Sequence, residues 1–366
     1  MALTLALAVV VLGGCSRGGG GSGASIDDTT TPSIAADGTT AGSATIAATP
    51  DTGGDSGGGG DGGGVSIPSD PTALCAGLTV GRTGQVATGD LEELSGLAPS
   101  GRQPGLLWAH NDSGNDVVLH ALDLDGAELG AVTVDGVDAT DIEDMAIAGG
   151  SVYLADIGDN DRQRSEIAVH RFPEPDPGAG SVPASDVETL RFRYPDRAHD
   201  AEALLIDPVD GTLLIVPKEI AFGAGENGTL VVAAEAPLYV ADPPFQAGEV
   251  RELRIDGAVA LDELDRLIEG QGPQEGLVAD LGGAGVATGA DVRSDGAVIA
   301  VRTYEAVWLF ARPAGTSLAE ALAGEPCPAP VEREPQGEAV AFLDGTSSAF
   351  VTISELDPAI HVTRAG

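Results

Sequence analysis

The stretch GLLWAHNDSGND (residues 105–116) is an apolar run that breaks off into His, Asn, Asp, Ser and Gly. A short apolar run that ends in turn residues indicates a buried β-strand followed by a turn. The same pattern recurs further along the chain, at VYLADIGDN (152–160), LLIVPKE (213–219), AVIAVRTYE (297–305) and AFVTISE (349–355). A recurring strand of this kind points to a fold built from equivalent units.

Another short apolar strand precedes each of these runs, and a tight turn separates the two. The earlier strands are EELSGLA (92–98), DIEDMAI (141–147), DAEALLI (200–206), TGADV (288–292) and GEAVAF (337–342). Asp-Gly turns at 210–211, 295–296 and 344–345 are strong hairpin signals. We expect third and fourth strands at VVLHALDL (117–124), AELGAVTV (127–134), EIAVHRF (166–172), VETLRFRY (187–194), PLYVAD (237–242) and EVRELRI (249–255).

Four short antiparallel strands that recur at about 48 residues predict the blades of an all-β propeller. Five blades are readable. The longest interval, about 88 residues between 200 and 288, hides a sixth blade or carries an insertion. Within it, 260–270 reads as a short helix and 274–280 as a strand. A β-sandwich is the competing fold, but it does not explain the repeated unit.

The two ends of the repeating region predict how the propeller closes. The last unit has only three strands, and LTVGRTGQV (78–86) belongs to no unit of its own. We expect this segment to complete the last blade as its outer strand, which removes an open sheet edge. Cys75 and Cys327 flank this seam and are predicted to form a disulfide, with a pair of free thiols as the alternative.

The composition limits the partners of the protein. The chain of 366 residues carries 57 acidic and 18 basic side chains, for a net charge of −39, and Lys218 is its single lysine. Such a surface repels nucleic acid and anionic lipid, so neither is expected as a partner. It suits divalent cations, cationic ligands, or solubility in high salt.

The N-terminal region predicts export and a membrane anchor. MALTLALAVVVLGG (1–14) is too short to span a bilayer, and Leu12, Gly13 and Gly14 before Cys15 resemble the end of a bacterial lipoprotein signal. A plain secretory signal and a stray apolar start are the alternatives. Residues 16–72 are mostly Gly, Ser, Thr, Ala and Asp, and we expect a disordered tether. The prediction is thus a signal (1–15) with lipidation at Cys15, a tether (16–72) and a propeller domain (73–366), lipid-anchored at the cell surface and monomeric.

The topology of a blade predicts where the polar side chains gather. Strands one and two are antiparallel, so the start of the first and the end of the second lie on one face, around the mouth of the channel. The first-strand starts bring Glu93, Asp141, Glu143, Asp200, Glu202, Asp291 and Glu338 to this face. The second-strand ends bring His110, Asn111, Asp112, Asp156, Asp159, Asn160, Lys218, Glu219, Arg302, Tyr304, Glu305 and Glu355.

Converging carboxylates predict a site for a hard cation, best suited to Ca²⁺. Asp141, Glu143, Asp200, Glu202 and Glu338 are the candidate metal ligands. Candidates for binding a ligand are Asn111, Asp112, Asp156, Asp159, Asn160, Glu219, Tyr304 and Glu355. His110, Lys218 and Arg302 are the catalytic candidates, because cationic groups beside a metal could hold a phosphate or carboxylate for attack by metal-bound water. For any single acid, an ordinary role in forming a turn is the simpler explanation.

Several blocks also carry a resemblance. ELSGLA, HNDSG, DIEDMAI, ADIGDN, DAEALL, RTY and GEAVAF look like the recurrent blocks of a family of exported bacterial propellers without an established activity. They are similar, more weakly, to phytase-like (esterase-like) propellers, whose acidic channel holds calcium. That resemblance implies that the five candidate metal ligands lie at the channel mouth. The chain departs from the weaker pattern at Asp144, Ala203 and Ala339, where Gly is usual, and it lacks a rich Lys and Arg set.

Two functions follow as expectations. The first is a propeller that binds an unknown small-molecule or surface ligand, with Ca²⁺, on its acidic face. The alternative is a metal-dependent hydrolase of phosphate or carboxylic esters, which requires His110, Lys218 and Arg302 to point into one pocket with the acids. A purely structural role is the remaining possibility.

Overall fold

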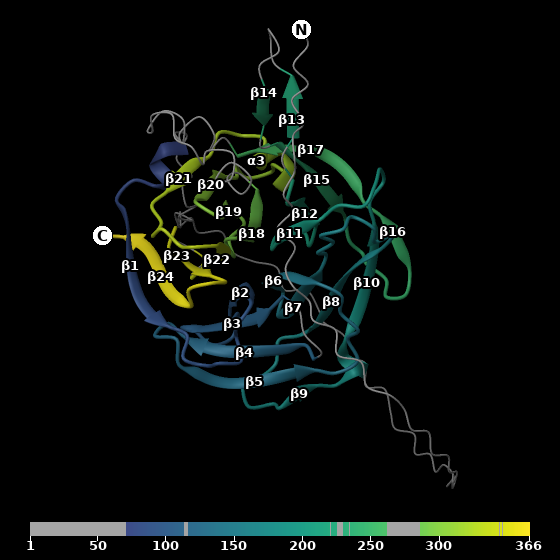
Figure 1. Ribbon diagram of the computed structural model, residues 1–366, viewed down its shortest axis with the longest axis vertical. Helices are drawn as coiled ribbons and strands as arrows, with labels where there is room; N and C mark the ends of the chain where they lie inside the picture. Colours follow the sequence, from purple (N-terminus) through teal and green to yellow (C-terminus); the bar gives the residue numbers. More distant parts are fainter. Residues whose placement is uncertain are drawn as a thin grey trace, which may run out of the picture. The chain divides into compact units, whose positions relative to one another are not determined.

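The computed structural model shows a five-bladed β-propeller (Figure 1). The structure describes residues 71–112, 116–219, 221–224, 230–233, 235–261, 286–343, 345 and 347–366. Several predictions lie outside these residues: the signal with Cys15, the tether up to residue 70, nearly all of the helix at 260–270, the strand at 274–280, and Asp344 of the last Asp-Gly turn.

Each blade begins at the centre with the two strands that the repeat predicts. The innermost strands are β2 (Leu94–Pro99), β6 (Ile142–Ala148), β11 (Ala201–Ile206), β18 (Ala287–Val292) and β22 (Gly337–Phe342). Each pairs antiparallel with the next strand in sequence: β3 (Leu106–Asn111), β7 (Ser151–Asp156), β12 (Leu213–Pro217), β19 (Val298–Thr303) and β23 (Phe350–Ser354). We number the blades 1 to 5 in this order.

The outer strands complete each blade. The third strands are β4 (Val118–Asp123), β8 (Ile167–Pro173), β15 (Glu235–Ala241), β20 (Val307–Ala311) and β24 (Ala359–Ala365). The fourth strands are β5 (Glu128–Val134), β10 (Glu188–Arg193), β17 (Arg254–Ala260), β21 (Cys327–Ala329) and β1 (Leu78–Gln85). A separate hairpin, β13 (Ala221–Ala224) with β14 (Leu230–Ala233), lies between β12 and β15 in sequence.

The predicted closure is confirmed. β1 pairs antiparallel with β24 from Leu78 opposite Ala365 to Gln85 opposite Ala359, so both ends of the folded region share blade 5. The predicted disulfide between Cys75 and Cys327 is also present, with Cα atoms 6.2 Å apart. It joins the segment just before β1 to β21, the outer strand of blade 4, and thus fastens the closing strand to the neighbouring blade.

Two blades carry a fifth strand that the sequence did not predict. β9 (Ser181–Val182) adds parallel to β5 of blade 1, and β16 (Val250–Glu252) adds parallel to β10 of blade 2. Each comes from a connection inside the following blade. EVRELRI, which we expected to be one strand, is therefore split between β16 of blade 2 and the start of β17 in blade 3.

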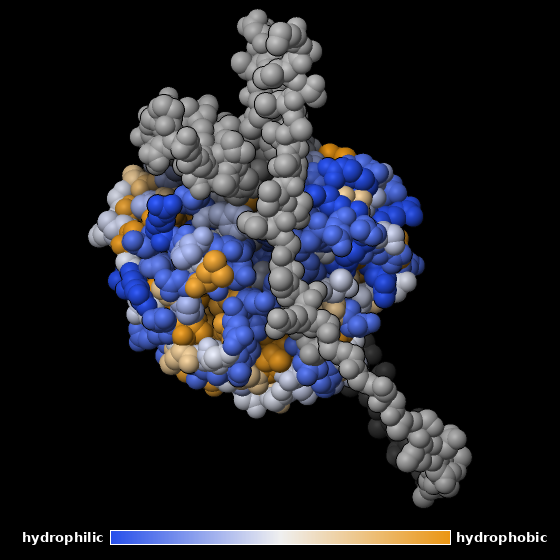
Figure 2. All heavy atoms as spheres, in the orientation of Figure 1, coloured by the Kyte–Doolittle hydropathy of each residue, from blue (hydrophilic) through white to orange (hydrophobic). Residues whose placement is uncertain are grey.

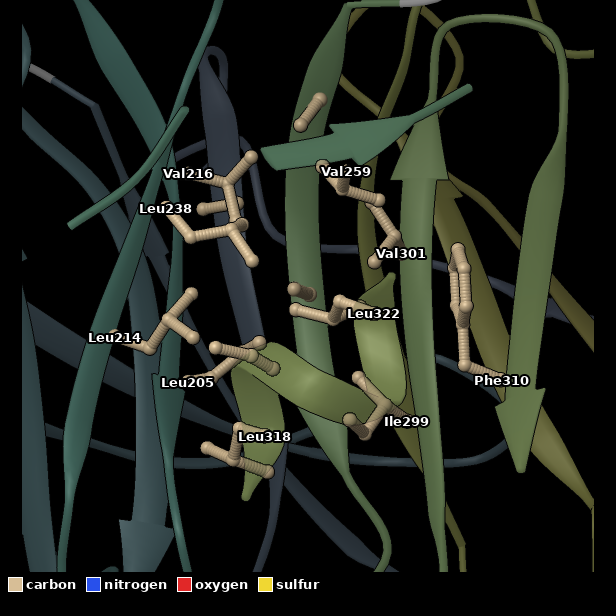
Figure 3. Packing of buried hydrophobic residues seen from close by; sticks show 14 of the residues in the cluster. Leu205, Leu214, Val216, Leu238, Val259, Ile299, Val301, Phe310, Leu318 and Leu322 are labelled. Atoms are coloured by element: carbon tan, nitrogen blue, oxygen red, sulfur yellow. The ribbon is translucent and has the colours of Figure 1, made fainter. Parts of the chain in front are cut away.

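The core lies between adjacent blades, and alternate residues of one strand serve two of its layers. On β12, Leu214 and Val216 pack against blade 4, whereas Leu213 and Ile215 pack against blade 2. Strands covered on both faces read as continuous apolar runs, which is the pattern seen in the sequence. Figure 3 shows the layer between blades 3 and 4, where Leu205 and Ile299 lie close to the short helix α3 (Leu318–Leu322).

Helix α3 begins with a capping box. The side chain of Ser317 accepts a hydrogen bond from the Glu320 amide, and the Glu320 side chain accepts one from the Ser317 amide. No helix among the described residues is long and apolar enough to cross a membrane. Hydrophilic side chains cover much of the face seen in Figure 2. Among the residues that the structure describes, the large exposed apolar side chains are Leu129, Val209, Val250, Ile255 and Leu356.

Candidate cation- and ligand-binding site

A β-bulge at the same place in every innermost strand defines the site. In β2, Leu94 pairs with Asn111 and Gly96 with His110, so the residue between them has no partner in the ladder. The other four blades repeat this irregularity. A bulge re-aims the side chain of the extra residue. The five bulge residues are Ser95, Glu143, Glu202, Thr288 and Glu338.

These five side chains form a ring around the channel, which we call the bulge ring. All five residues are buried. The Ser95 hydroxyl donates to the Glu143 carbonyl oxygen at 2.6 Å, and its oxygen lies 3.3 Å from Glu143 Oε2. Glu202 of blade 3 interacts electrostatically with both Glu143 of blade 2 and Glu338 of blade 5, which is not an adjacent blade. The three glutamates therefore face one another across the channel.

Two aspartates extend the ring. Asp141 accepts a hydrogen bond from the protonated side chain of Glu143, and a Cβ atom on Gly158 would overlap a carboxylate oxygen of each. Glycine at 158 thus lets the two carboxyl groups converge. Asp200 accepts a hydrogen bond from the Asp159 amide at 2.9 Å. All five candidate metal ligands are consequently part of one electrostatically connected acidic cluster.

The only lysine of the chain lies in this cluster. The Lys218 ammonium donates a hydrogen bond to Glu202 Oε1 and lies 5.0 Å from the centre of the Tyr304 ring. The backbone amide of Lys218 donates to the Asp200 carbonyl oxygen at 2.8 Å, which fixes the start of the side chain. Glu202 Oε2 is buried and has no hydrogen-bond partner in the described part of the chain.

Negative charge outweighs positive charge in the cluster. Burial, and after it the charges of Glu202 and Asp141, raise the pKa of Glu143 well above its usual range. Burial and the charge of Glu202 do the same to the pKa of Glu338. Burial also raises the pKa of Glu202 to about 7, although Lys218 works in the opposite direction. A cation bound among these carboxylates would reduce the repulsion between them. It would also give the buried Glu202 Oε2 a partner.

The donor chemistry fits a hard cation. Carboxylate oxygens are the ligands that Ca²⁺ prefers, and an unpaired buried oxygen is available at Glu202. Within the described ranges, no three His, Cys, Asp or Glu side chains already have the arrangement of a metal site. The Lys218 ammonium, which is bonded to Glu202, has to move before a metal ion can use that carboxylate fully.

The loop after β7 orients two of the acids. Asp156 accepts hydrogen bonds from the Thr140 and Asp141 amides at 3.2 and 3.0 Å and pairs with Arg164 at 2.9 Å. Asp159 accepts from the Arg164 amide at 2.7 Å. Asp156 and Asp159, which the sequence suggested as ligand-binding residues, therefore position Asp141 and Asp200. Asn160 in the same loop is exposed.

The other predicted ligand-binding residues fall into two groups. Tyr304 contacts Lys218, and Glu355 reaches the ring through Gln336, whose side-chain amide also donates to Glu338 Oε1 at 2.8 Å. The second group lies outside the acidic cluster and consists of Asn111, Asp112 and Glu219. The Asn111 side chain bridges the backbone of Asp90 and Glu93, and Asn111 and Asp112 line a separate cavity of about 300 Å³ between blade 1 and the start of blade 2. Glu219 pairs with Arg197 and His199.

The structure does not bring the three catalytic candidates together. His110 is 1% exposed, its Nδ1 lies 2.9 Å from the Asn111 carbonyl oxygen, and its ring covers Gly96. Burial lowers the pKa of His110 to about 4. Arg302 has no exposed surface, lies over Gly337 and pairs with Glu334 at 2.7 Å. Only Lys218 of the three belongs to the acidic cluster.

One further correction concerns the rim. Asp291 is not equivalent to Glu143 or Glu202, because Thr288 holds that position in blade 4. The Asp291 carboxylate instead accepts the Phe342 and Val292 amides at 2.7 and 2.8 Å, which ties blade 4 to blade 5. Glu93 lies two residues before the bulge residue of blade 1, Ser95, as Asp141 and Asp200 do in blades 2 and 3.

Sequence reasoning also missed the role of Asp144, whose buried carboxylate lies beneath the bulge ring. Asp144 is 2% exposed, and its Oδ2 accepts the Leu204 amide of blade 3 at 2.8 Å and the Ala290 amide of blade 4 at 3.3 Å. Its side chain thus crosses from blade 2 into the channel. Ser95 and Thr288 were missed as well. Aligning the five first strands in register, as LSGLA, IEDMA, AEALL, ATGAD and GEAVA, is the signal that would have found both.

Fold and site together define the class: a five-bladed propeller with an acidic channel mouth. The sequence matches no protein-family model and no curated protein. An iodide structure of a Trichoderma reesei protein of carbohydrate-active enzyme family AA12 is similar at 10% identity and a TM-score of 0.44, covering 83% of this chain and 100% of that one. PQQ-bound aldose sugar dehydrogenase from Streptomyces coelicolor follows at 12% identity and a TM-score of 0.42, covering 82% and 99%. Such distant similarity carries no argument about activity.

Proposed function

We propose that the protein is an exported, lipid-anchored propeller that binds a ligand at its acidic channel mouth with the help of a bound cation, Ca²⁺. The observation that carries the proposal is the bulge ring. Three of its five positions are glutamates, all buried, and their charges act on one another across the channel. Turn formation explains acids in loops, but it does not require buried acids at bulges of innermost strands.

The location rests on the sequence of the N-terminal region and on the disulfide. A Leu-Gly-Gly-Cys run after an apolar stretch, followed by a Gly- and Ser-rich segment, favours a lipid anchor and a tether. Disulfides persist mainly in oxidising compartments, so a Cys75–Cys327 bond supports export. A propeller held at the surface in this way can present its channel mouth to a small molecule or to another surface component.

The hydrolase alternative receives less support. It required a general acid or base and two cations beside the acids, yet His110 and Arg302 are buried with partners of their own. The resemblance to phytase-like propellers implies acids at the channel mouth, but it also implies a set of basic residues for holding phosphate. Of the three cationic candidates only Lys218 lies in the cluster, and the nearby Arg164 is paired with Asp156.

A thermal-unfolding experiment tests the proposal. The melting temperature of the protein is measured in Ca²⁺ and in chelator, for the wild type and for Glu143→Gln. Ligand at about a hundredfold excess over its Kd stabilises by about 2.7 kcal/mol, which corresponds to several degrees for a domain of this size. We expect such an increase in the wild type and its loss in the variant, since glutamine keeps the shape of the side chain but removes its charge.

Glu188→Gln is the matched control, because Glu188 lies half-exposed on β10 and pairs with Arg171, away from the channel. It should retain the full response to Ca²⁺. A wild-type melting temperature that is equal in Ca²⁺ and chelator would count against the proposal. So would a response that Glu143→Gln preserves, because the ion would then bind elsewhere.

A further inference from the structure

Lys218 holds a position that an incoming cation would need. Its ammonium is hydrogen-bonded to Glu202, which belongs to the bulge ring, and lies over the ring of Tyr304 from blade 4. The Lys218 side chain is 22% exposed, so it has a route to solvent that the buried Glu202 lacks. Since the backbone amide of Lys218 is held by Asp200, only the four-carbon stem and the ammonium are free to change position.

The electrostatic interactions of Lys218 show that it acts on the cluster as a whole. Burial disfavours its charge, but the negative charges of Glu202 and Glu338 outweigh that effect. Lys218 in turn favours the ionised forms of Glu143, Glu202 and Glu338. One positive charge is therefore shared among three carboxylates, and the second oxygen of Glu202 still has no hydrogen-bond partner in the part of the chain described.

We infer that Lys218 is a tethered counter-ion that competes with external cations for the bulge ring and thereby makes the site selective for divalent over monovalent ions. This inference rests on the proposed function. The competition follows from Coulomb's law: the ammonium already provides one positive charge at Glu202. A monovalent ion that displaces it brings no additional charge and loses the lysine hydrogen bond, whereas a divalent ion brings one charge more.

The Tyr304 ring gives the displaced ammonium a second resting place. An ammonium over an aromatic face is stabilised by the negative potential of that face, and the Lys218 ammonium already lies 5.0 Å from the ring centre. A divalent ion can thus take over Glu202 while Lys218 stays near Tyr304 or moves into solvent. Displacing the ammonium costs the same free energy whichever cation enters, so only an ion that gains more than this cost from the carboxylates stays bound. A divalent ion gains more from the same carboxylates than a monovalent ion does.

The test compares wild type, Lys218→Met and Lys218→Arg by calorimetric titration with CaCl₂, and by melting temperature in NaCl against choline chloride at equal ionic strength. Methionine keeps most of the length of the stem without its charge. We expect Lys218→Met to bind Ca²⁺ roughly tenfold more tightly than the wild type. It should also gain a stabilisation by Na⁺ that the wild type lacks. Lys218→Arg, which retains the charge, should behave as the wild type.

Unchanged or weaker Ca²⁺ binding in Lys218→Met, with the wild type binding through Glu143, overturns the inference and leaves the proposed function standing. Absence of Ca²⁺ binding in both proteins overturns the proposed function itself. A second measurement uses only the wild type, so it remains available if the variant does not fold. Because Lys218 is the only lysine, ¹⁵N-lysine labelling gives a single Nζ resonance. It should shift on addition of Ca²⁺ but not of Na⁺, and a resonance insensitive to Ca²⁺ contradicts displacement.

Discussion

A single glycine can leave the space in which a side chain at the end of a second strand is buried. Without that space the side chain would have to lie elsewhere, for example at the channel mouth. His110 lies over Gly96, and Arg302 lies over Gly337 of the next blade. A Cβ atom at either glycine would overlap the covering side chain. The acids of the mouth depend on the same kind of space, since Gly158 leaves room for Asp141 and Glu143. The types of the residues do not show which side chains are buried in this way, because the glycine and the side chain that covers it can lie far apart in sequence.

Burial of His110 makes stability depend on pH. Its pKa is about 4 in the folded protein, against an ordinary value of 6.5, so the unfolded chain binds the proton more readily between these values. The stability that neutral His110 contributes is complete above pH 6.5 and is lost as the pH falls toward 4. From the size of the shift this amounts to about 3 kcal/mol. His110→Gln, which does not titrate, should flatten the acid limb of a plot of unfolding free energy against pH.

Urea unfolding at several pH values between 4 and 8 provides the measurement. If His110→Gln shows the same slope as the wild type, His110 is not responsible for the loss of stability in acid.

At the scale of elements, the blades are joined by contacts on the face opposite the channel mouth. Arg312, just after β20, forms a two-pronged ion pair with Asp207, just after β11, at 2.9 and 2.5 Å. The corresponding join between blades 1 and 2 is Glu174, which accepts from the indole of Trp108 at 3.1 Å. The parallel strand β9 is a second join between blades 1 and 2, and β16 joins blades 2 and 3.

Breaking the buried ion pair should therefore weaken the whole propeller. Arg312→Met leaves the buried Asp207 carboxylate without its partner, and we expect a loss of about 3–5 kcal/mol in the free energy of unfolding. The double variant Asp207→Asn with Arg312→Met should lose much less, because no uncompensated charge remains. Denaturant unfolding of these proteins checks both values.

The exposed pair of Arg171 and Glu188 provides the comparison, since Arg171→Met should cost about 1 kcal/mol or less. Equal losses for Arg312→Met and Arg171→Met would show that the buried pair does not hold the blades together.

The sequence predicted the elements that have a local signal and missed those that do not. First and second strands combine apolar runs with turn residues, and all five pairs are confirmed. β9 and β16 have only two and three residues, too few for any periodicity, and their partners lie in another blade. For the site, topology brought the acids to one face, but the bulge that selects Glu143 over Asp291 as a ring residue is a property of strand pairing.

At the scale of the whole molecule, the propeller is closed twice: by β1 in blade 5 and by the Cys75–Cys327 disulfide. The disulfide bridges a sequence separation of 252 residues, so it removes much of the freedom of the unfolded chain. We expect reduction, or the double variant Cys75→Ala with Cys327→Ala, to cost about 2–5 kcal/mol.

Melting temperatures with and without reductant measure this contribution. The double variant should melt at the temperature of the reduced wild type and should not respond to reductant. A wild-type melting temperature that reductant leaves unchanged would contradict a stabilising role for the disulfide.

The same covalent link has a mechanical consequence. A pull on the chain from its N-terminal side reaches Cys75 before it reaches β1, and the disulfide passes the load directly to β21. The chain between the two cysteines is bypassed, so tension between the termini can lengthen only the segments outside the loop. Four of the five bulge-ring residues lie inside it, and Glu338 alone lies beyond Cys327. While the disulfide is intact, most of the acidic mouth is shielded from stretching by whatever holds the N-terminal side.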